Sequence, residues 1–87
     1  MKFVDVFFDR AERYALGVEE ESATAYLSIP VANHLVDYEE YYALSDREYA
    51  ALLGDPVAAR EFAEECRRRR HDARLMLTPG SDRGSPA

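Results

Sequence analysis

The chain has 87 residues, a length that supports one small domain with a modest core and argues against a large internal active-site cavity. Hydrophobic residues make up 47% and charged residues 32% of it, a balance typical of a folded globular domain and not of a disordered segment. A formal net charge of −6 opposes binding to nucleic acid phosphates and favours a basic protein partner.

The charge is unevenly distributed along the chain. Residues 1–66 hold fifteen acidic and five basic side chains, whereas residues 67–87 hold two acidic and six basic ones. Acidic side chains also keep a domain soluble, so the pattern leaves open whether they serve solubility or partner binding.

The sequence predicts a cytoplasmic protein. Cys66 is the only cysteine, so no intrachain disulfide can form. The first residues, MKFVDVFFDRAE, carry charges within their apolar stretch and lack a secretory cleavage site. No apolar run approaches the ~20 residues of a membrane-spanning helix, so we expect no membrane association.

The N-terminal part of the chain predicts strands. In residues 2–9, Val4, Val6 and Phe8 would share one face of a strand, although a helix fits this segment nearly as well. Residues 13–18 alternate more clearly between apolar and other side chains, which predicts a half-buried strand.

Two further strands complete the predicted sheet. Residues 23–31 form one strand, in which Pro30 marks an edge, a bulge or the end. Asn33 lies in the next turn, where it can adopt a left-handed conformation at low cost. Residues 35–44 form the last strand. Three strands joined by short turns make an antiparallel meander.

Ser45 is predicted to begin a helix. Ser45 and Glu48 have the spacing of a capping box, in which each satisfies a free backbone N–H of the other. This helix would carry Tyr49, Leu52 and Leu53 inward. Gly54, the usual residue of a left-handed C-terminal cap, would end it.

Asp55 is predicted to cap a second helix, whose first residue is Pro56. Apolar side chains near three- and four-residue spacing form its predicted inner stripe: Val57, Ala58, Phe62, Ala63 and Cys66. The whole chain is thus an α+β domain over residues 1–78, a small antiparallel β-meander packed on one face by two C-terminal helices. A polar C-terminal tail follows at residues 79–87.

The last strand of the meander carries the candidate binding surface. Asp37, Glu39 and Tyr41 would share one face, where carboxylates accept charge-assisted hydrogen bonds and tyrosine gives rigid contact area. Such a surface suits an arginine- or lysine-rich partner, and a solvated sheet face covered by tyrosines is the alternative. The residues predicted to bind a partner are Asp37, Tyr38, Glu39, Glu40, Tyr41 and Tyr42.

Glu40 is an exception within this set, because its place in the alternation puts it on the core face. Three explanations are open: an arginine pairs with it, the strand edge frays there, or the predicted register is wrong.

The chain shows no arrangement typical of catalysis. Adjacent carboxylates can serve acid–base hydrolysis, but no pocket-forming length accompanies them here. His34 and His71 lack partners at metal-ligand spacing. We therefore expect no enzymatic activity, no cofactor and no metal. Cys66 is interpreted as a small buried apolar residue, although the arginines beside it leave a reactive thiol open.

Residues 67–70, with His71 and Arg74, form a basic cluster that could contact phosphate. The same arginines can instead complete the dipole of the preceding helix and pair with its glutamates. Binding to nucleic acid is therefore the less favoured interpretation.

The segment YLSIPVANHLVDYEEYYALS, in an acidic meander followed by two helices, resembles small cytoplasmic immunity proteins of bacterial polymorphic toxin systems. The resemblance spans residues 13–70 and consists of size, charge and element order, so it carries over no site residue. It implies a stoichiometric inhibitor that covers the active site of a basic toxin with its acidic, tyrosine-rich surface. The alternatives are a structural or regulatory module, such as a homodimer joined through its sheet edge or tyrosine face, and a small nucleic-acid-associated protein.

Overall fold

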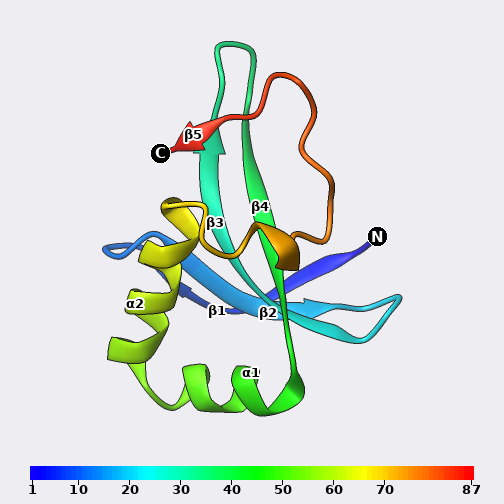
Figure 1. Ribbon diagram of the computed structural model, residues 1–87. Coiled ribbons are helices and arrows are strands. Elements are labelled where there is room, and N and C mark those ends of the chain that lie inside the picture. The colour runs from blue at the N-terminus through cyan, green and yellow to red at the C-terminus, as the bar shows by residue number, and fades with distance from the viewer.

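The computed structural model describes residues Met1–Ala87 and shows an antiparallel sheet with two helices on one face (Figure 1). The elements in chain order are β1 (Phe3–Asp9), β2 (Tyr14–Glu19), β3 (Thr24–Ala32), β4 (Asp37–Leu44), α1 (Asp46–Leu53), α2 (Pro56–Arg67), the 3-10 helix η1 (Asp72–Arg74) and β5 (Ser85–Pro86). Strands β1 to β4 pair in sequence order, and β5 pairs with β3. The predicted α+β fold is confirmed. Neither α-helix has the length and apolar composition needed to span a bilayer.

The N-terminal segment is a strand, which decides between the two predicted possibilities. The pairing of β1 with β2 shifts register between Asp5 and Phe7, which is a β-bulge. Val4 lies before the bulge and Phe8 after it, so they face opposite sides of the sheet. The prediction that they share a face is wrong, because one extra residue interrupts the two-residue alternation.

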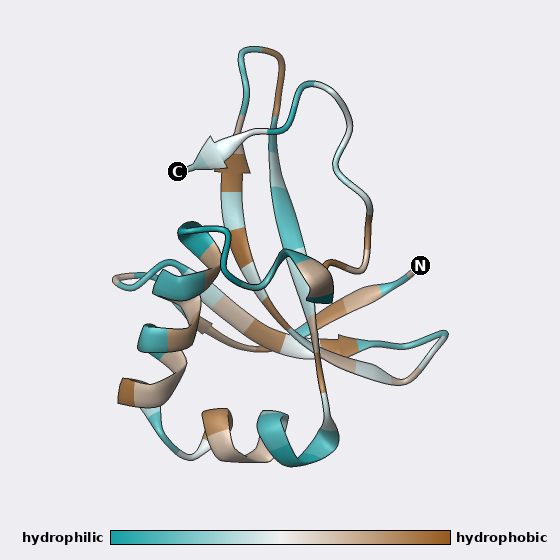
Figure 2. Cartoon of the chain, viewed as in Figure 1, coloured by the Kyte–Doolittle hydropathy of each residue, from teal (hydrophilic) through white to brown (hydrophobic).

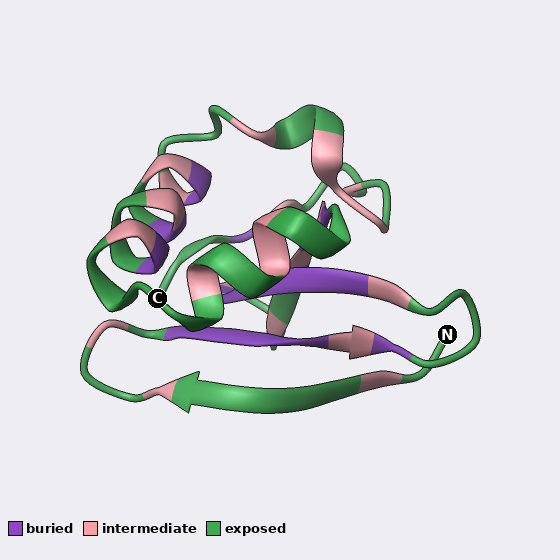
Figure 3. Cartoon of the chain, turned by 90° about the horizontal axis from the view of Figure 1, so that it is seen from below, coloured by how far each residue is buried: buried purple, intermediate pink, exposed green.

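The core lies between the sheet and α2. Alternate residues of β2, β3 and β4 meet the small side chains of α2, as their spacing predicts. The buried cluster consists of Tyr14, Leu16, Ala25, Leu27, Ile29, Val31, Tyr42, Leu44, Ala59, Ala63 and Cys66. Figure 3 shows the result, with the central strands buried and β1 exposed along almost its whole length.

The inner faces of both helices differ in part from the predicted ones. On α2, Ala59 is buried and Val57 is exposed. These positions are two residues apart, roughly 200° around a helix, so the stripe that continues to Ala63 excludes Val57. On α1, Leu52 packs against the core while Leu53 is exposed.

Both helices begin where the sequence predicts. The Ser45 hydroxyl accepts the Glu48 N–H at 3.1 Å, and the Glu48 carboxylate accepts the Ser45 N–H at 2.8 Å. Asp55 caps α2 by accepting the Ala58 N–H at 3.1 Å. Gly54 has a right-handed conformation with φ of −89°, so the predicted left-handed cap is wrong. The chain passes from Gly54 directly into the Asp55 cap, which leaves no room for a separate turn.

Asn33 shapes the turn between β3 and β4 through its side chain. Its amide oxygen accepts the N–H groups of Leu35 and Val36, each at 2.8 Å. Asn33 does not have positive φ. The predicted left-handed conformation is therefore wrong, because these hydrogen bonds produce the turn instead. They also delay the start of β4 to Asp37.

Glu19 holds the turn between β2 and β3. Its carboxylate accepts hydrogen bonds from the Ser22 hydroxyl at 2.6 Å and from the backbone N–H groups of Lys2, Glu21 and Ser22. These donors, the Ser22 hydroxyl above all, favour the charged form and lower the pKa of Glu19 to about 2.

We expect acid to weaken the fold through Glu19. Its carboxyl titrates near 4.5 in the unfolded chain and near 2 in the folded one, so its stabilisation is complete above pH 4.5 and is lost as pH falls towards 2. Glu19→Gln should lower the Tm at pH 7 and flatten the dependence of Tm on pH over this range. Thermal unfolding followed by circular dichroism measures both, with Glu20→Gln as a control that should change little. A wild-type Tm that is constant across this range would contradict the assignment.

We also expect Ser45→Ala to destabilise the domain by about 1 kcal/mol, because an N–H at the start of α1 loses its acceptor. In a domain of this size the Tm should fall by roughly 4–8 °C. Calorimetry of this variant beside Ser81→Ala, an exposed serine in the tail, separates the cap from general effects of losing a hydroxyl. Equal Tm values for both variants would show that the Ser45 cap does not contribute to the stability of the fold.

Candidate functional site

The six residues predicted to bind a partner all lie on β4, where they alternate between the two faces of the sheet. One group faces the helices and consists of Tyr38, Glu40 and Tyr42; the other lies on the open face and consists of Asp37, Glu39 and Tyr41. The structure therefore divides the predicted surface into two groups with different surroundings.

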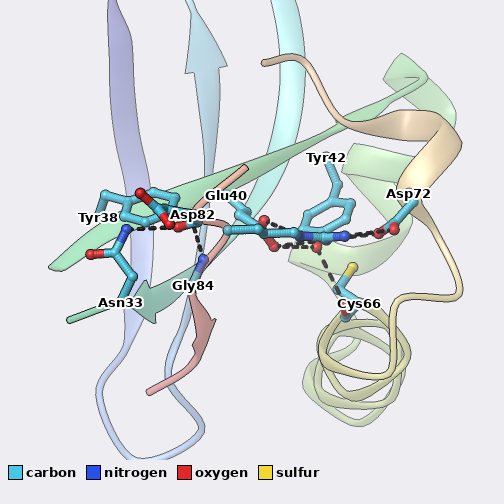
Figure 4. A network of polar contacts seen from close by, with 9 residues as sticks. Asn33, Tyr38, Glu40, Tyr42, Cys66, Asp72, Asp82 and Gly84 are labelled. Carbon is cyan, nitrogen blue, oxygen red and sulfur yellow. Dashed lines mark hydrogen bonds and ion pairs between the residues drawn. The ribbon is translucent and has the colours of Figure 1, made fainter. Parts of the chain in front are cut away.

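Glu40 forms an ion pair with Arg83 of the C-terminal tail. The Arg83 Nε donates to Glu40 Oε2 at 2.7 Å, and Arg83 Nη1 donates to Asp72 Oδ2 at 2.7 Å (Figure 4). The side chains of Glu40 and Arg83 are only 7% and 14% exposed. Arg83 therefore joins two carboxylates, which raises its own pKa and lowers that of Asp72. Among the explanations open for Glu40, an arginine partner is correct. We call these three side chains the Arg83 clamp.

Two tyrosines of the same face extend the Arg83 clamp. The Tyr42 hydroxyl donates to Glu40 Oε1 at 3.0 Å and lies 3.4 Å from the carbonyl oxygen of Cys66 (Figure 4). Burial, followed by this hydrogen bond, raises the pKa of Tyr42. The Tyr38 hydroxyl accepts the Gly84 N–H at 2.6 Å. Tyr38, Glu40 and Tyr42 thus hold the tail against the sheet.

Gly84 lets the tail reach its place beside β3. A Cβ at this position would lie 2.8 Å from the carbonyl carbon and oxygen of Ala32, closer than real Cβ contacts. The N–H of Ala87 then donates to the Pro30 carbonyl, and β5 pairs with the end of β3. The tail at residues 79–87, polar in sequence, therefore contributes β5 to the sheet and Arg83 to its ion pairs.

The open face holds an aromatic cluster. The Tyr41 ring stacks on Phe3 of β1 with centroids 3.6 Å apart, and both rings meet Tyr26 edge-on. The Tyr26 hydroxyl donates to Asp5 at 2.6 Å. Phe3 and Tyr41 come from opposite ends of the strand order, so the sheet curls until its two outer strands meet across this face.

A hollow of about 300 Å³ lies beside the outer edge of β4. Residues 38–41 line one side and residues 77–80 the other, with Asn33 and Asp82 completing the wall. After η1, which lies beside β4, the chain arches away from the sheet and returns as β5, as Figure 1 shows. This volume is at the lower end of the range for small-molecule sites. We call this space the β4 hollow.

The edge of β4 is unpaired where it borders the β4 hollow. Closer to α1, the Met76 N–H bonds to the Tyr41 carbonyl at 2.9 Å and Arg74 bonds to the Ala43 carbonyl at 3.1 Å. Backbone groups alternate in direction along a strand, so Glu39 also directs its N–H and C=O to this edge. No strand of the sheet pairs with Glu39 on that side.

The carboxylates of Asp37, Glu39 and Asp82 form no ion pair, in contrast to Glu40. The Glu39 side chain is exposed, and the partial loss of solvent around its carboxylate raises its pKa, an effect to which the charge of Asp5 adds. Solvent limits the cost of ionising Glu39 at neutral pH, and a nearby cation would lower that cost further.

The basic cluster is largely bound within the protein. Arg67 Nη2 donates to the carbonyls of Glu12 and Arg13, each at 2.6 Å. Arg74 makes two hydrogen bonds to the Glu48 carboxylate. Other members pair within the helical region: Arg68 with Glu64, and His71 with Glu65. Only Arg69 and Arg70 lack ion-pair partners.

Cys66 is buried, as the sequence predicts. Burial raises the pKa of its thiol to about 12, so the thiol is protonated at neutral pH. No three histidine, cysteine, aspartate or glutamate side chains form a group that could hold a metal ion.

Sequence reasoning missed the contribution of the tail. A glutamate on a core face predicts a cation, yet the sequence offers eleven lysines and arginines and does not identify Arg83. Gly84, next to it in an otherwise polar segment, was the one local sign of a close backbone approach. No protein family, curated protein or solved structure matches this chain.

We expect Arg83→Ala to destabilise the domain by about 3–5 kcal/mol, because the buried carboxylate of Glu40 would lose its ion-pair partner. The double variant Glu40→Leu with Arg83→Met removes both charges and should recover most of that loss. Chemical denaturation measures the free energies of unfolding, with Arg69→Ala as an unpaired control. A loss no larger for Arg83→Ala than for Arg69→Ala would contradict the importance of the Arg83 clamp.

Proposed function

We propose that this domain is a non-catalytic protein-binding domain that captures a basic segment of another protein at the β4 hollow. The observation that carries the proposal is Glu39, an unpaired carboxylate whose pKa is raised, on an open strand edge. Groups that destabilise their own fold are found preferentially at functional sites, because a ligand then relieves the unfavourable interaction.

The contacts available suit an extended segment that carries arginine or lysine. The free N–H and C=O of Glu39 can pair with the backbone of an added strand. A cationic side chain of that strand would enter the β4 hollow between Glu39 and Asp82, which both lie in its wall. Tyr41 is a further part of that wall, and a guanidinium packs favourably on an aromatic ring.

Long-range charge supports the same class of partner. Residues 1–66, which include β4, hold fifteen acidic and only five basic side chains. The field of such a surface attracts a basic protein and accelerates its association at low salt. A basic toxin, held in a stoichiometric inhibitory complex, is the partner that the resemblance to immunity proteins favours. The domain would act by covering the active site of its partner.

We expect Glu39→Lys to slow association with the partner by about tenfold or more at low salt, since it reverses a charge at the centre of the contact. The partner would be captured from the source cell on immobilised wild type, and its association rate then measured at low and high salt. Glu61→Lys changes the net charge equally on the outer face of α2 and should have a much smaller effect. Equal association rates for the two variants would exclude the β4 hollow as the site.

We further expect Glu39→Gln to stabilise the free domain while it weakens the complex. The folded-state pKa lies above the ordinary 4.5, so ionised Glu39 destabilises the fold at neutral pH and protonated Glu39 does not. The Tm of Glu39→Gln should therefore exceed that of wild type at pH 7, and the difference should vanish below about pH 4. Calorimetry at both pH values measures this, and a lower Tm at pH 7 would show that Glu39 serves the fold.

A further inference from the structure

Half of the exposed large apolar side chains of this protein lie at its N-terminus. Val4 is 38% exposed, Val6 64%, Phe7 42% and Phe8 58%, all on β1. Figure 2 shows hydrophobic segments on this strand as well as on the strands beneath the helices. The helices do not reach β1, which is exposed along almost its whole length (Figure 3). Val4 and Phe7 lie on the helix-side face of β1 and Phe8 on the opposite face, so apolar side chains line both sides of this strand. Exposed apolar surface of this kind marks an interaction site.

The backbone of β1 is also free on its outer side. The Lys2 carbonyl accepts the Glu20 N–H at 2.8 Å, so Lys2 and, two residues on, Val4 direct their backbone groups towards β2. Phe3 and Asp5 then direct theirs away from the sheet. Because β1 is the first strand in the sheet order, nothing pairs with these groups.

We propose that β1 pairs with β1 of a second copy of this chain, as antiparallel strands centred on Val4, to form a symmetric dimer. This inference uses the backbone edge of β1, whereas the proposed function uses the edge of β4, although the Phe3 side chain stacks on Tyr41 of the β4 hollow. The occupant of the β1 edge is a second copy because β1 complements itself in one register.

Two requirements select that register. First, the backbone N–H and C=O groups that point away from one sheet must bond to the corresponding groups of the second copy. This holds when each Phe3 pairs with Asp5 of the second copy. Second, like charges must not lie opposite each other, and here each Asp5 faces a phenylalanine. The two Val4 side chains then meet at the symmetry axis. A register centred on Asp5 would place two carboxylates together. One centred on Phe3 would pair Asp5 with Met1, which lies outside β1 and whose amino group pairs with Glu21 at 3.0 Å. The bulge after Asp5 prevents a longer ladder.

The other edge of the sheet restricts the assembly to two copies. On β4, residues 41–43 are covered by the backbone of Met76 and the side chain of Arg74. Beyond them, Leu77 lines the β4 hollow and is 50% exposed, but the carboxylates of Glu39 and Asp82 in the same wall disfavour a second copy that brings its own Asp5 to this edge. A symmetric contact between two β1 strands uses both copies of this edge, so it closes without forming a fibre.

The response to added salt distinguishes this dimer from the proposed partner complex. Each copy carries a net charge of −6, so two copies repel one another and salt should strengthen their apolar contact. Capture of a basic partner by acidic residues should weaken under the same conditions. Loss of one interaction leaves the other measurable.

The test is sedimentation equilibrium of the intact chain from about 1 μM to 1 mM, a range that covers weak association. We expect a monomer–dimer equilibrium that tightens with added salt. Val4→Lys places two like charges at the symmetry axis and should raise the dimer Kd by at least about tenfold. Val57→Lys, a matched change at an exposed valine of α2, should leave the Kd unchanged.

A second variant tests the register and does not depend on how well Val4→Lys folds. Val4→Cys puts two thiols opposite each other at the separation that a disulfide requires, so mild oxidation should give a covalent dimer. Val57→Cys should remain monomeric, and the native Cys66 is buried. A monomer at the highest concentration, an unchanged Kd in Val4→Lys, or equal cross-linking of both cysteine variants would each overturn the proposal.

Discussion

The C-terminal third of this fold depends on one buried charge. Glu40 lies on the core face of β4, where an unpaired carboxylate would be strongly destabilising. Arg83 satisfies it, and Asp72 holds the other side of the same guanidinium. Because Arg83 is in the tail, this requirement brings the tail across the sheet, where β5 can pair with β3. The segment between Asp72 and Arg83 must then arch beside β4, and that arch forms the outer wall of the β4 hollow.

The curl of the sheet determines what the open face presents. Gly17 leaves space for the Tyr26 ring, which lies against Phe3 and Tyr41. This cluster takes Tyr41 out of free solvent and brings Asp5 near Glu39, where its charge adds to the loss of solvent that chiefly raises the pKa of Glu39. The carboxylate with the strongest reason to bind a cation thus follows from aromatic packing between the two outer strands.

The two outer strands differ in chemistry, which makes the two proposed contacts compatible. At β4 the unpaired carboxylates and the free backbone suit a basic segment. At β1 the apolar side chains and the self-complementary register suit a second copy. Opposite responses to salt are expected, because one contact relies on attraction between unlike charges and the other on burial of apolar surface between like-charged bodies. A dimer formed in this way would present two β4 hollows.

Local patterns in the sequence were enough to determine the strands β2 to β4, their inner faces and the starts of both helices. The alternation of strands and the Ser45–Glu48 capping box both depend on residues at most four positions apart, so the sequence shows them directly. They also placed Glu40 on the core face, with an arginine partner as one of three open explanations. The partner itself, 43 residues away, was decided by the tertiary structure, as were the β1 bulge, the shift from Val57 to Ala59 and the β4 hollow. Each of these depends on which distant surfaces meet, and the energy of a contact between distant residues is set only when the whole chain has packed.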